Sequence, residues 1–422
     1  MINDDIMKEK GGLEMDTLVN KEGLKILGSL IKLNRLNQKM SQQALCEGIC
    51  VPSYLSKIEN GEVIPSLDMI KLLFDELAID YLSDYEWLKQ MKEQIDDFFE
   101  ELNLNGFIHL EQLFKNLKVN ESKFIHSPLV VDYYLAKLAY TCGSLERDGY
   151  NEAYLLLNSI ESLLSKDQRY KFYFYQGIDA LYFYHNYEQA KEYFELARQY
   201  LETGRLYELL AIVSYKRGNY FESYQAVLEA RRRYLQEGNL ISMIGLYEFE
   251  GMLAYKTGSI VDAIEQCERA ISFAKKMNRL DLAVTPWLTK TFIHYSSDEL
   301  HLVKMCLNEI KKLQDDLGVT WPIFDIHQLM IKIVDSNQKM SDLFDIYNQA
   351  LEEMKPALGL MIFGLTQGEV VIDDLSNLIR SYTQGTSRFL FIDEWVFSLL
   401  KSYHLSKRQY KEVVQLLEKG HL

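Results

Sequence analysis

The feature that most constrains the fold of this chain is a recurring triplet of small or apolar residues, spaced four and then three positions apart. It begins at Ala190 and returns at Ser223, Ala263, Val303 and Leu343, at intervals of 33, 40, 40 and 40 residues. This spacing places the three side chains of each triplet on one face of a helix. The regular return predicts stacked helix hairpins, because each hairpin buries its apolar face only against its neighbours.

The small residues in these triplets allow two helices to pack closely. The full set is Ala190, Phe194 and Ala197; Ser223, Val227 and Ala230; Ala263, Cys267 and Ala270; Val303, Leu307 and Ile310; and Leu343, Tyr347 and Ala350. Ala153, Leu157 and Ile160 fit as an earlier copy, and Val413 and Leu417 as a last one. Residues 355–380 fit no unit well. The marks resemble tetratricopeptide repeats and predict an all-α fold with a superhelical array of helix hairpins; an irregular helical bundle is the alternative.

A second pattern lies near the N-terminus, in residues 41–61, SQQALCEGICVPSYLSKIENG. Ser41 is suited to cap a helix, and Pro52 to be the first residue of the next one. Gly61 is suited to end that second helix in a left-handed conformation. The pattern predicts two short helices around a tight turn, which is the unit that places a helix in the major groove of DNA.

The pattern SQxxL…LSKIENG…PS resembles the helix-turn-helix of the Xre/Cro repressor superfamily over about residues 23–80. The resemblance implies that Gln42 contacts a phosphate and that Asn60 lies near the duplex backbone. It also places Pro52, Ser53 and Lys57 at positions that face base edges. Tyr54 either packs beside the turn or reaches DNA.

Charge supports a DNA-binding head. Residues 21–61 hold six basic and three acidic side chains, a net charge of +3, whereas the whole chain carries −15. Attraction to phosphates supplies most non-specific affinity for DNA, and a single head with +3 is weak for this purpose. We therefore expect a homodimer with two heads on double-stranded operator DNA.

Length and composition restrict the class of protein further. A chain of 422 residues with 48% hydrophobic and 25% charged residues indicates a soluble protein of two or three domains. There is no run of eighteen apolar residues, and the first residues do not form a signal peptide, so we expect no membrane span and a cytoplasmic location. The five scattered cysteines predict neither disulfides nor a zinc site. No motif of a catalytic site occurs, so we expect no enzyme, cofactor or metal.

The repeat register predicts which side chains of the first helix of each hairpin line a concave groove. The predicted groove residues are Tyr182, Glu208, Tyr215, Lys216, Glu248, Tyr255, Lys256 and Tyr295. Tyrosine offers a large rigid contact area with a hydroxyl group, and lysine and glutamate can meet peptide termini. The set suits a short extended peptide, although each tyrosine can equally pack between hairpins. Arg231, Arg232 and Arg233 indicate a solvated helix face or, alternatively, a clamp for the carboxylates of a ligand or partner.

We divide the chain into a disordered tail (1–20), a helix-turn-helix domain (21–81), linker helices (82–126) and a repeat domain (127–422). This order resembles the Gram-positive quorum-sensing regulators of the Rgg, NprR and PlcR type (the RRNPP group). The resemblance implies a dimeric transcription regulator whose repeats bind a short linear signalling peptide. Two alternatives remain open: a repeat protein that inhibits or scaffolds a response regulator, and a phage-type lysis–lysogeny peptide receptor.

Overall fold

The computed structural model describes most of the chain between residues 21 and 412. The described ranges are 21–82, 84–104, 110–142, 147–318, 324–326, 329–330, 340–350, 354–369, 375–384, 390–409 and 411–412. Within these ranges every regular element is a helix, and no strand occurs. The all-α prediction is therefore confirmed. The expected tail at 1–20 and the last triplet at Val413 lie outside the described residues.

The chain divides into two compact units. The first ends at Gln176 and includes Glu195–Leu201, and the second comprises Gly177–Phe194 and the chain from Glu202 onward. The helices α11 (Lys166–Tyr182) and α12 (Tyr187–Arg198) each cross this division. The predicted domain boundaries near residues 81 and 126 fall inside the first unit and remain a division based on sequence.

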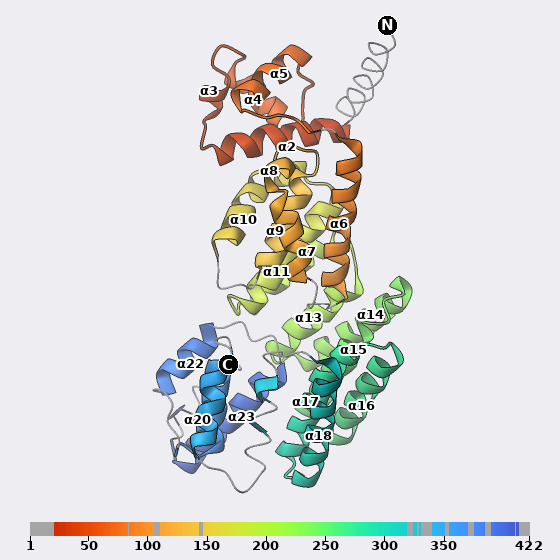
Figure 1. Ribbon diagram of the computed structural model, residues 1–422, viewed down its shortest axis with the longest axis vertical. Coiled ribbons are helices and arrows are strands. Elements are labelled where there is room, and N and C mark those ends of the chain that lie inside the picture. Colours follow the sequence, from red (N-terminus) through yellow and green to blue (C-terminus); the bar gives the residue numbers. More distant parts are fainter. Residues whose placement is uncertain are drawn as a thin grey trace. The chain divides into compact units, whose positions relative to one another are not determined.

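The helix-turn-helix opens the first unit (Figure 1). Its helices are α2 (Lys21–Asn37), α3 (Gln42–Leu45), α4 (Pro52–Glu59) and α5 (Leu67–Glu76). As expected, the Ser41 hydroxyl accepts a hydrogen bond from the Ala44 amide at 3.0 Å, and Pro52 begins α4. Gly61 has φ +66°, which favours glycine at the end of α4. These local signals fix both ends of the motif.

The rest of the first unit is a set of helices on which the head packs. They are α6 (Tyr85–Asn103), α7 (Leu110–Val119), α8 (Glu121–Phe124), α9 (Val130–Thr141), α10 (Asp148–Ser159), the 3-10 helix η1 (Glu161–Leu163) and the start of α11. The Asn34 side chain in α2 donates to the carbonyl of Ile125 at 2.9 Å. The Leu82 amide donates to the carbonyl of His126, also at 2.9 Å. Because α2 also packs on α10 and η1, the head is fixed to this unit by direct contacts.

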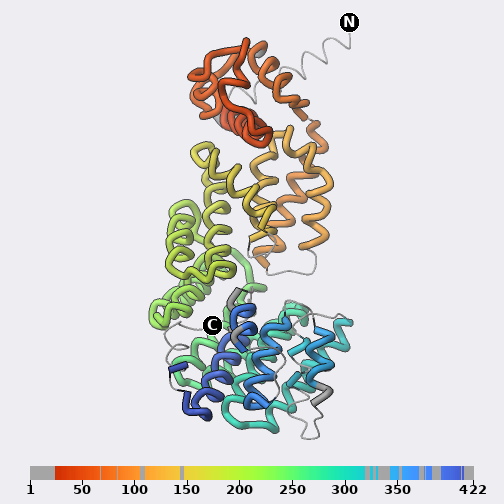
Figure 2. The backbone as a smooth tube through the Cα atoms, turned by 90° about the vertical axis from the view of Figure 1, so that its left-hand side faces the viewer, coloured from red at the N-terminus to blue at the C-terminus, as the bar shows by residue number. Residues whose placement is uncertain are grey.

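The second unit is built from the predicted hairpins (Figures 1 and 2). The first pair is α13 (Gly204–Lys216) with α14 (Tyr220–Glu237), and the second is α15 (Met243–Lys256) with α16 (Ile260–Lys276). The third pair is α17 (Val284–Ser296) with α18 (Leu300–Leu317). The 3-10 helix η2 (Leu280–Ala283) directly precedes α17. The second helices carry the triplets: Ala263, Cys267 and Ala270 in α16 are fully buried. A Cβ atom on Gly177 in α11 would lie 2.5 Å from the Phe194 ring. Small residues thus permit the close packing that the spacing predicted.

Further along the second unit lie the helices α20 (Met340–Gln349), α21 (Lys355–Leu365), α22 (Leu375–Gln384) and α23 (Leu390–Ser406). The helix α23 packs against α21 and also reaches α17. Its Trp395 ring lies 5.6 Å from the rings of both Phe292 and Tyr295, between centroids. Figure 2 shows this blue segment beside the green and teal hairpins. The helix α23 therefore packs on the first helices of the repeats.

None of the helices in the described ranges has the length and apolarity needed to span a membrane.

Candidate DNA-binding face and candidate ligand-binding face

The helix-turn-helix is held together by one buried carboxylate. Glu59 at the end of α4 is 1% exposed and accepts hydrogen bonds from Arg35 Nε at 2.5 Å and Arg35 Nη2 at 2.9 Å. The Gln42 side chain donates to the same carboxylate at 2.7 Å. Arg35 Nη1 donates in addition to the carbonyl of Met40 at 2.9 Å. The network joins α2, α3 and α4, and it fixes the angle at which α4 is presented.

The side chains predicted to meet DNA lie on or beside α4. Pro52, Ser53, Lys57 and Asn60 are exposed, and Tyr54 is half-buried. The Asn60 side chain donates to Glu62 at 3.3 Å. The structure thus leaves the predicted base-facing positions open to solvent. Their contact with DNA stays a prediction.

Gln42 differs from the other predicted DNA contacts because its side chain is engaged inside the head. The bond to Glu59 orients the amide and uses one of its two N–H groups. The other N–H and the amide oxygen are not used by that bond. A phosphate contact by Gln42 therefore remains a prediction, with its side chain already oriented by α4.

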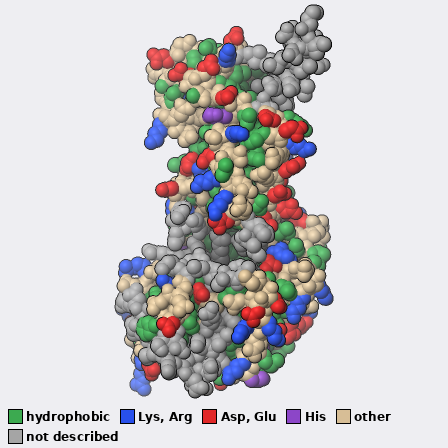
Figure 3. Space-filling view, viewed as in Figure 1, with side chains coloured by type: hydrophobic (Ala, Val, Ile, Leu, Met, Phe, Trp, Pro, Cys, Tyr) green, Lys and Arg blue, Asp and Glu red, His purple; other side chains and the backbone are tan. Residues whose placement is uncertain are grey.

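The helix α6, which follows the head in the chain, carries several exposed acidic side chains. Glu93, Asp96, Asp97 and Glu100 are exposed there. In Figure 3 red side chains gather on the side of the first unit where α6 lies. A face of this charge repels phosphate, which disfavours DNA contact through α6.

Four of the predicted groove residues contact α23. Tyr215 OH donates to Glu394 Oε1 at 3.0 Å, and Lys256 Nζ donates to Glu394 Oε2 at 2.6 Å. Lys216 Nζ donates to Asp393 Oδ2 at 2.5 Å. Tyr295, the fourth, packs against the Trp395 ring. These four residues are therefore covered by a helix of the same chain that lies far along the sequence, 138 positions beyond Lys256 and 179 beyond Tyr215.

The charges of this contact are mutually stabilised. Burial lowers the pKa of Lys216, but the attraction of Asp393, Tyr187 and Glu394 together with the hydrogen bond to Asp393 outweighs it, so that the pKa lies above its ordinary value. Burial, and then the charge of Glu394, raise the pKa of Tyr215 well above its ordinary value. At neutral pH the tyrosine is therefore a neutral donor and the lysine a cation.

The remaining predicted groove residues are also held within the second unit. Glu208 is 4% exposed and accepts a hydrogen bond from Arg205 at 2.8 Å and another from the Tyr234 hydroxyl. The ring of Tyr255 meets Phe292 edge-on, with centroids 5.0 Å apart. Tyr182 ends α11 and is half-buried. The structure does not test a role of these residues in peptide binding.

Glu248 has an unusual environment. It accepts hydrogen bonds from the hydroxyls of Thr285 at 2.7 Å and Thr289 at 2.9 Å. Burial raises its pKa to about 7, although the two hydroxyls oppose the rise. Glu248 therefore changes charge near neutral pH.

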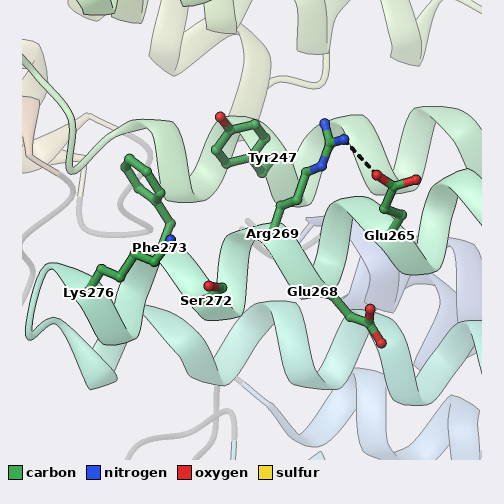
Figure 4. A pocket seen from close by; sticks show the side chains of 7 residues that line it. All are labelled: Tyr247, Glu265, Glu268, Arg269, Ser272, Phe273 and Lys276. Carbon is green, nitrogen blue, oxygen red and sulfur yellow. Dashed lines mark hydrogen bonds and ion pairs between the residues drawn. The ribbon is translucent and has the colours of Figure 1, made fainter.

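Two hollows in the second unit are lined by residues that were not predicted to line the groove. The larger, of about 310 Å³, lies along α16 next to Tyr247 of α15. Figure 4 shows Arg269 and Glu265 at its rim turned toward one another, at 2.6 Å. The second, of about 240 Å³, lies between α17 and α18 beside Trp287. Neither hollow includes a predicted groove residue.

The three consecutive arginines of α14 form ion pairs with glutamates of the chain. Arg231 pairs with Glu250, and Arg233 pairs with Glu202. Arg232 pairs with Glu229 on the same helix. The run is half-exposed, and its guanidinium groups pair with carboxylates of the chain itself, so a clamp for a ligand or partner stays a prediction.

The sequence did not single out several residues that organise these faces. They are Arg35 and Glu59 in the head, and Tyr382, Asp393 and Glu394 in the second unit. Only the pair Arg35 and Glu59 had a local signal, since the two lie within one motif, on α2 and α4. Among the described residues no group of three or more His, Cys, Asp or Glu side chains is placed to hold a metal ion.

Comparisons with known proteins agree with this architecture. Residues 31–82 match the model of the helix-turn-helix family. The transcriptional activator NprA of Geobacillus stearothermophilus is 24% identical over 254 residues, which are 57% of this chain and 61% of that protein. The chain thus aligns with less than two thirds of the length of this relative.

Two solved structures show the same fold. The apo form of RapI has a TM-score of 0.51 at 14% identity, over 78% of this chain and 99% of RapI. Aspartyl phosphate phosphatase F from Bacillus subtilis has a TM-score of 0.50 at 12% identity, over 95% of this chain and 94% of its own.

The fold and the head define a class: a helix-turn-helix domain joined to a body of tetratricopeptide-like hairpins. The match to the helix-turn-helix family is confined to residues 31–82. With an NprA-like sequence and a Rap-like fold, the resemblance to the Rgg, NprR and PlcR group is confirmed.

Proposed function

We propose that this protein is a transcription regulator, and not an enzyme, that binds operator DNA as a homodimer in the cytoplasm. Its second unit binds a short signalling peptide, which sets the affinity for DNA. The observation that carries the proposal is the exposed face of α4, held in place by the buried Glu59 network at the end of a repeat-built body. NprA, with a related sequence, is named as a transcriptional activator.

In this proposal the DNA contacts come from one face of the head. Lys57 and Ser53 read base edges, Asn60 and Gln42 lie near phosphates, and Pro52 offers only apolar contact because it has no N–H group. Two heads double the positive charge that faces the duplex. We expect two half-sites separated by about 10 base pairs or a multiple of this distance.

The proposed coupling between peptide and DNA follows linkage. A peptide that binds one arrangement of the hairpins better than another shifts the population toward the first arrangement. The head is fixed to the first unit by the bonds from Asn34 and Leu82. A change of the first unit therefore carries the head with it and alters the spacing of two heads in the dimer.

The test is to find the operator and the contacts that read it. The purified full chain is mixed with fragments of its genome, and retained fragments are sequenced and footprinted. We expect protection of two half-sites by the wild-type chain, and much weaker protection by the Ser53→Ala/Lys57→Ala variant. Uniform retention of all fragments, equal for both proteins, would contradict sequence-specific binding.

A second candidate function rests on the fold of the second unit. RapI and aspartyl phosphate phosphatase F share this fold over nearly their whole length. In this alternative the hairpins bind a phosphorylated response regulator, either instead of or together with the peptide. Capture of the cell's receiver domains on the immobilised full chain tests it: retention of one receiver domain, lost on addition of peptide, would support it.

The phage-type peptide receptor remains a variant of the same proposal. It predicts the same head, the same peptide site and the same dimer. Operators found next to phage genes would favour it, whereas a small neighbouring gene for a secreted peptide favours quorum sensing.

A further inference from the structure

The contact between α23 and the repeats has a specific chemistry. Each of two adjacent carboxylates is held by one tyrosine hydroxyl and one lysine ammonium group. Glu394 accepts hydrogen bonds from Tyr215 and Lys256, and Asp393 accepts them from Lys216 and from the hydroxyl of Tyr382. The four donors come from α13, α15 and α22, so the arrangement is tertiary and not a local helix pairing.

The groups of this contact are withdrawn from water. Asp393 and Glu394 are 6% and 5% exposed, and the side chains of Lys216 and Lys256 are 9% and 18% exposed. Ion pairs buried in this way contribute little net stability, because the loss of hydration offsets the attraction. They impose a strong selection on chemistry, however, since a neutral occupant leaves two ammonium groups unpaired.

The fit of α23 is also incomplete. The indole N–H of Trp395 is buried and finds no acceptor among the described residues. A buried donor without a partner is unfavourable, and a ligand that offers it a suitable acceptor avoids this cost. The charges of Asp393 and Glu394 are thus well matched by the surrounding donors, whereas the neighbouring Trp395 lacks a hydrogen-bond acceptor among the described residues.

We propose that Tyr215, Lys216, Lys256 and Tyr382 form a receptor for paired carboxylates. In the ligand-free chain Asp393 and Glu394 of α23 occupy it. The signalling peptide carries acidic groups, displaces these two side chains, and so competes with the chain's own helix. This inference rests on the proposed peptide-binding function and names the chemical class of the peptide.

The experiment uses a peptide with the sequence of residues 391–398, FIDEWVFS, joined to polyethylene glycol for solubility. The matched control is FINQWVFS, which has the same shape without the two charges. Binding is measured by calorimetry to the wild-type full chain, to Asp393→Asn/Glu394→Gln, and to that variant with Lys216→Met and Lys256→Met added.

We expect the acidic peptide to bind the Asp393→Asn/Glu394→Gln chain at least tenfold more tightly than the wild type, since the internal competitor has lost its charges. The neutral peptide and the chain without the two lysines are expected to give no such gain. Equal binding of both peptides, or no binding of the acidic peptide to the double variant, would overturn the proposal.

A second measurement keeps the test valid if the double variant unfolds. Hydrogen exchange of α23 in the wild-type chain is expected to rise when the acidic peptide is added and to stay constant with the neutral one; no rise with either would count against displacement. Operator binding without peptide is measured on the same samples. The chain could bind operator and respond to a neutral peptide without needing Lys216 and Lys256. That result would support the proposed function but refute the inference that the peptide is acidic.

Discussion

The head and the repeat face use buried charge in opposite ways. In the head, Glu59 binds Arg35 and Gln42 underneath the surface, and the side chains of Ser53 and Lys57 above them stay exposed. On the repeat face, the predicted ligand residues are themselves part of the buried network, because Lys216 and Lys256 bind α23. The head thus leaves its predicted contact residues exposed, whereas on the repeat face the lysines are already paired with carboxylates of the chain.

The largest effect is expected from Glu59→Ala. The substitution leaves the guanidinium of Arg35, which is 7% exposed, without its carboxylate partner. Removing one side of a buried ion pair costs about 3–5 kcal/mol, so we expect early melting of the head and loss of DNA binding. Chemical denaturation followed by circular dichroism measures this. Glu62→Ala nearby is the control, because an exposed residue changes stability by about 0.5 kcal/mol or less. Equal stability of both variants would refute the role of the network.

A smaller loss is expected from Gly177→Ala in the repeats. The new Cβ would lie 2.5 Å from the ring of Phe194, which is fully buried. Overpacking costs about 1–3 kcal/mol, more than the gain of about 1 kcal/mol in helix propensity. Thermal melting measures the balance. Adding Phe194→Leu is expected to restore part of the loss, and a stabilised single variant would show that the helices are less closely packed than described.

Lys57→Ala separates binding from folding in the head. The side chain is exposed, so the melting temperature is expected to stay within about 1 °C of the wild type. Operator affinity is expected to fall by about 1–2 kcal/mol, mainly through base discrimination at one position of each half-site. Fluorescence anisotropy against a set of operator variants measures this. Unchanged affinity at physiological salt would exclude the proposed orientation of α4.

The smallest effect concerns Glu248 and pH. Its pKa of about 7 in the folded chain lies above the ordinary value of 4.5, so the folded state holds a proton that the unfolded state has released. Stability from this residue is therefore full below pH 4.5 and is lost as the pH rises to about 7. We expect Glu248→Gln to flatten the decrease in melting temperature between pH 5 and 7.5. Identical pH profiles of both chains would contradict the burial of this carboxyl.

The sequence predicted the elements of this fold better than the contacts between distant elements. The triplets such as Ala263, Cys267 and Ala270 predicted their burial, because helix periodicity is a local property. Ser41, which caps α3, and Pro52, the first residue of α4, predicted where these two helices begin for the same reason.

The occupant of the repeat face was not predictable in this way. Asp393 and Glu394 look like ordinary acidic residues of a helix, and only the return of α23 to α13 and α15 makes them partners of lysines. Likewise, nothing in the local pattern around Gln42 shows that its amide binds Glu59. Pairing over long sequence separations depends on tertiary packing, which local spacing does not encode.

The most direct test of the central claim is hydrogen exchange of the full chain in four states: alone, with operator DNA, with an acidic peptide, and with both. The account predicts that DNA protects α4 and that the acidic peptide increases exchange in α23. Exchange in α23 that is the same in all four states, while the peptide is shown to be bound, would contradict it.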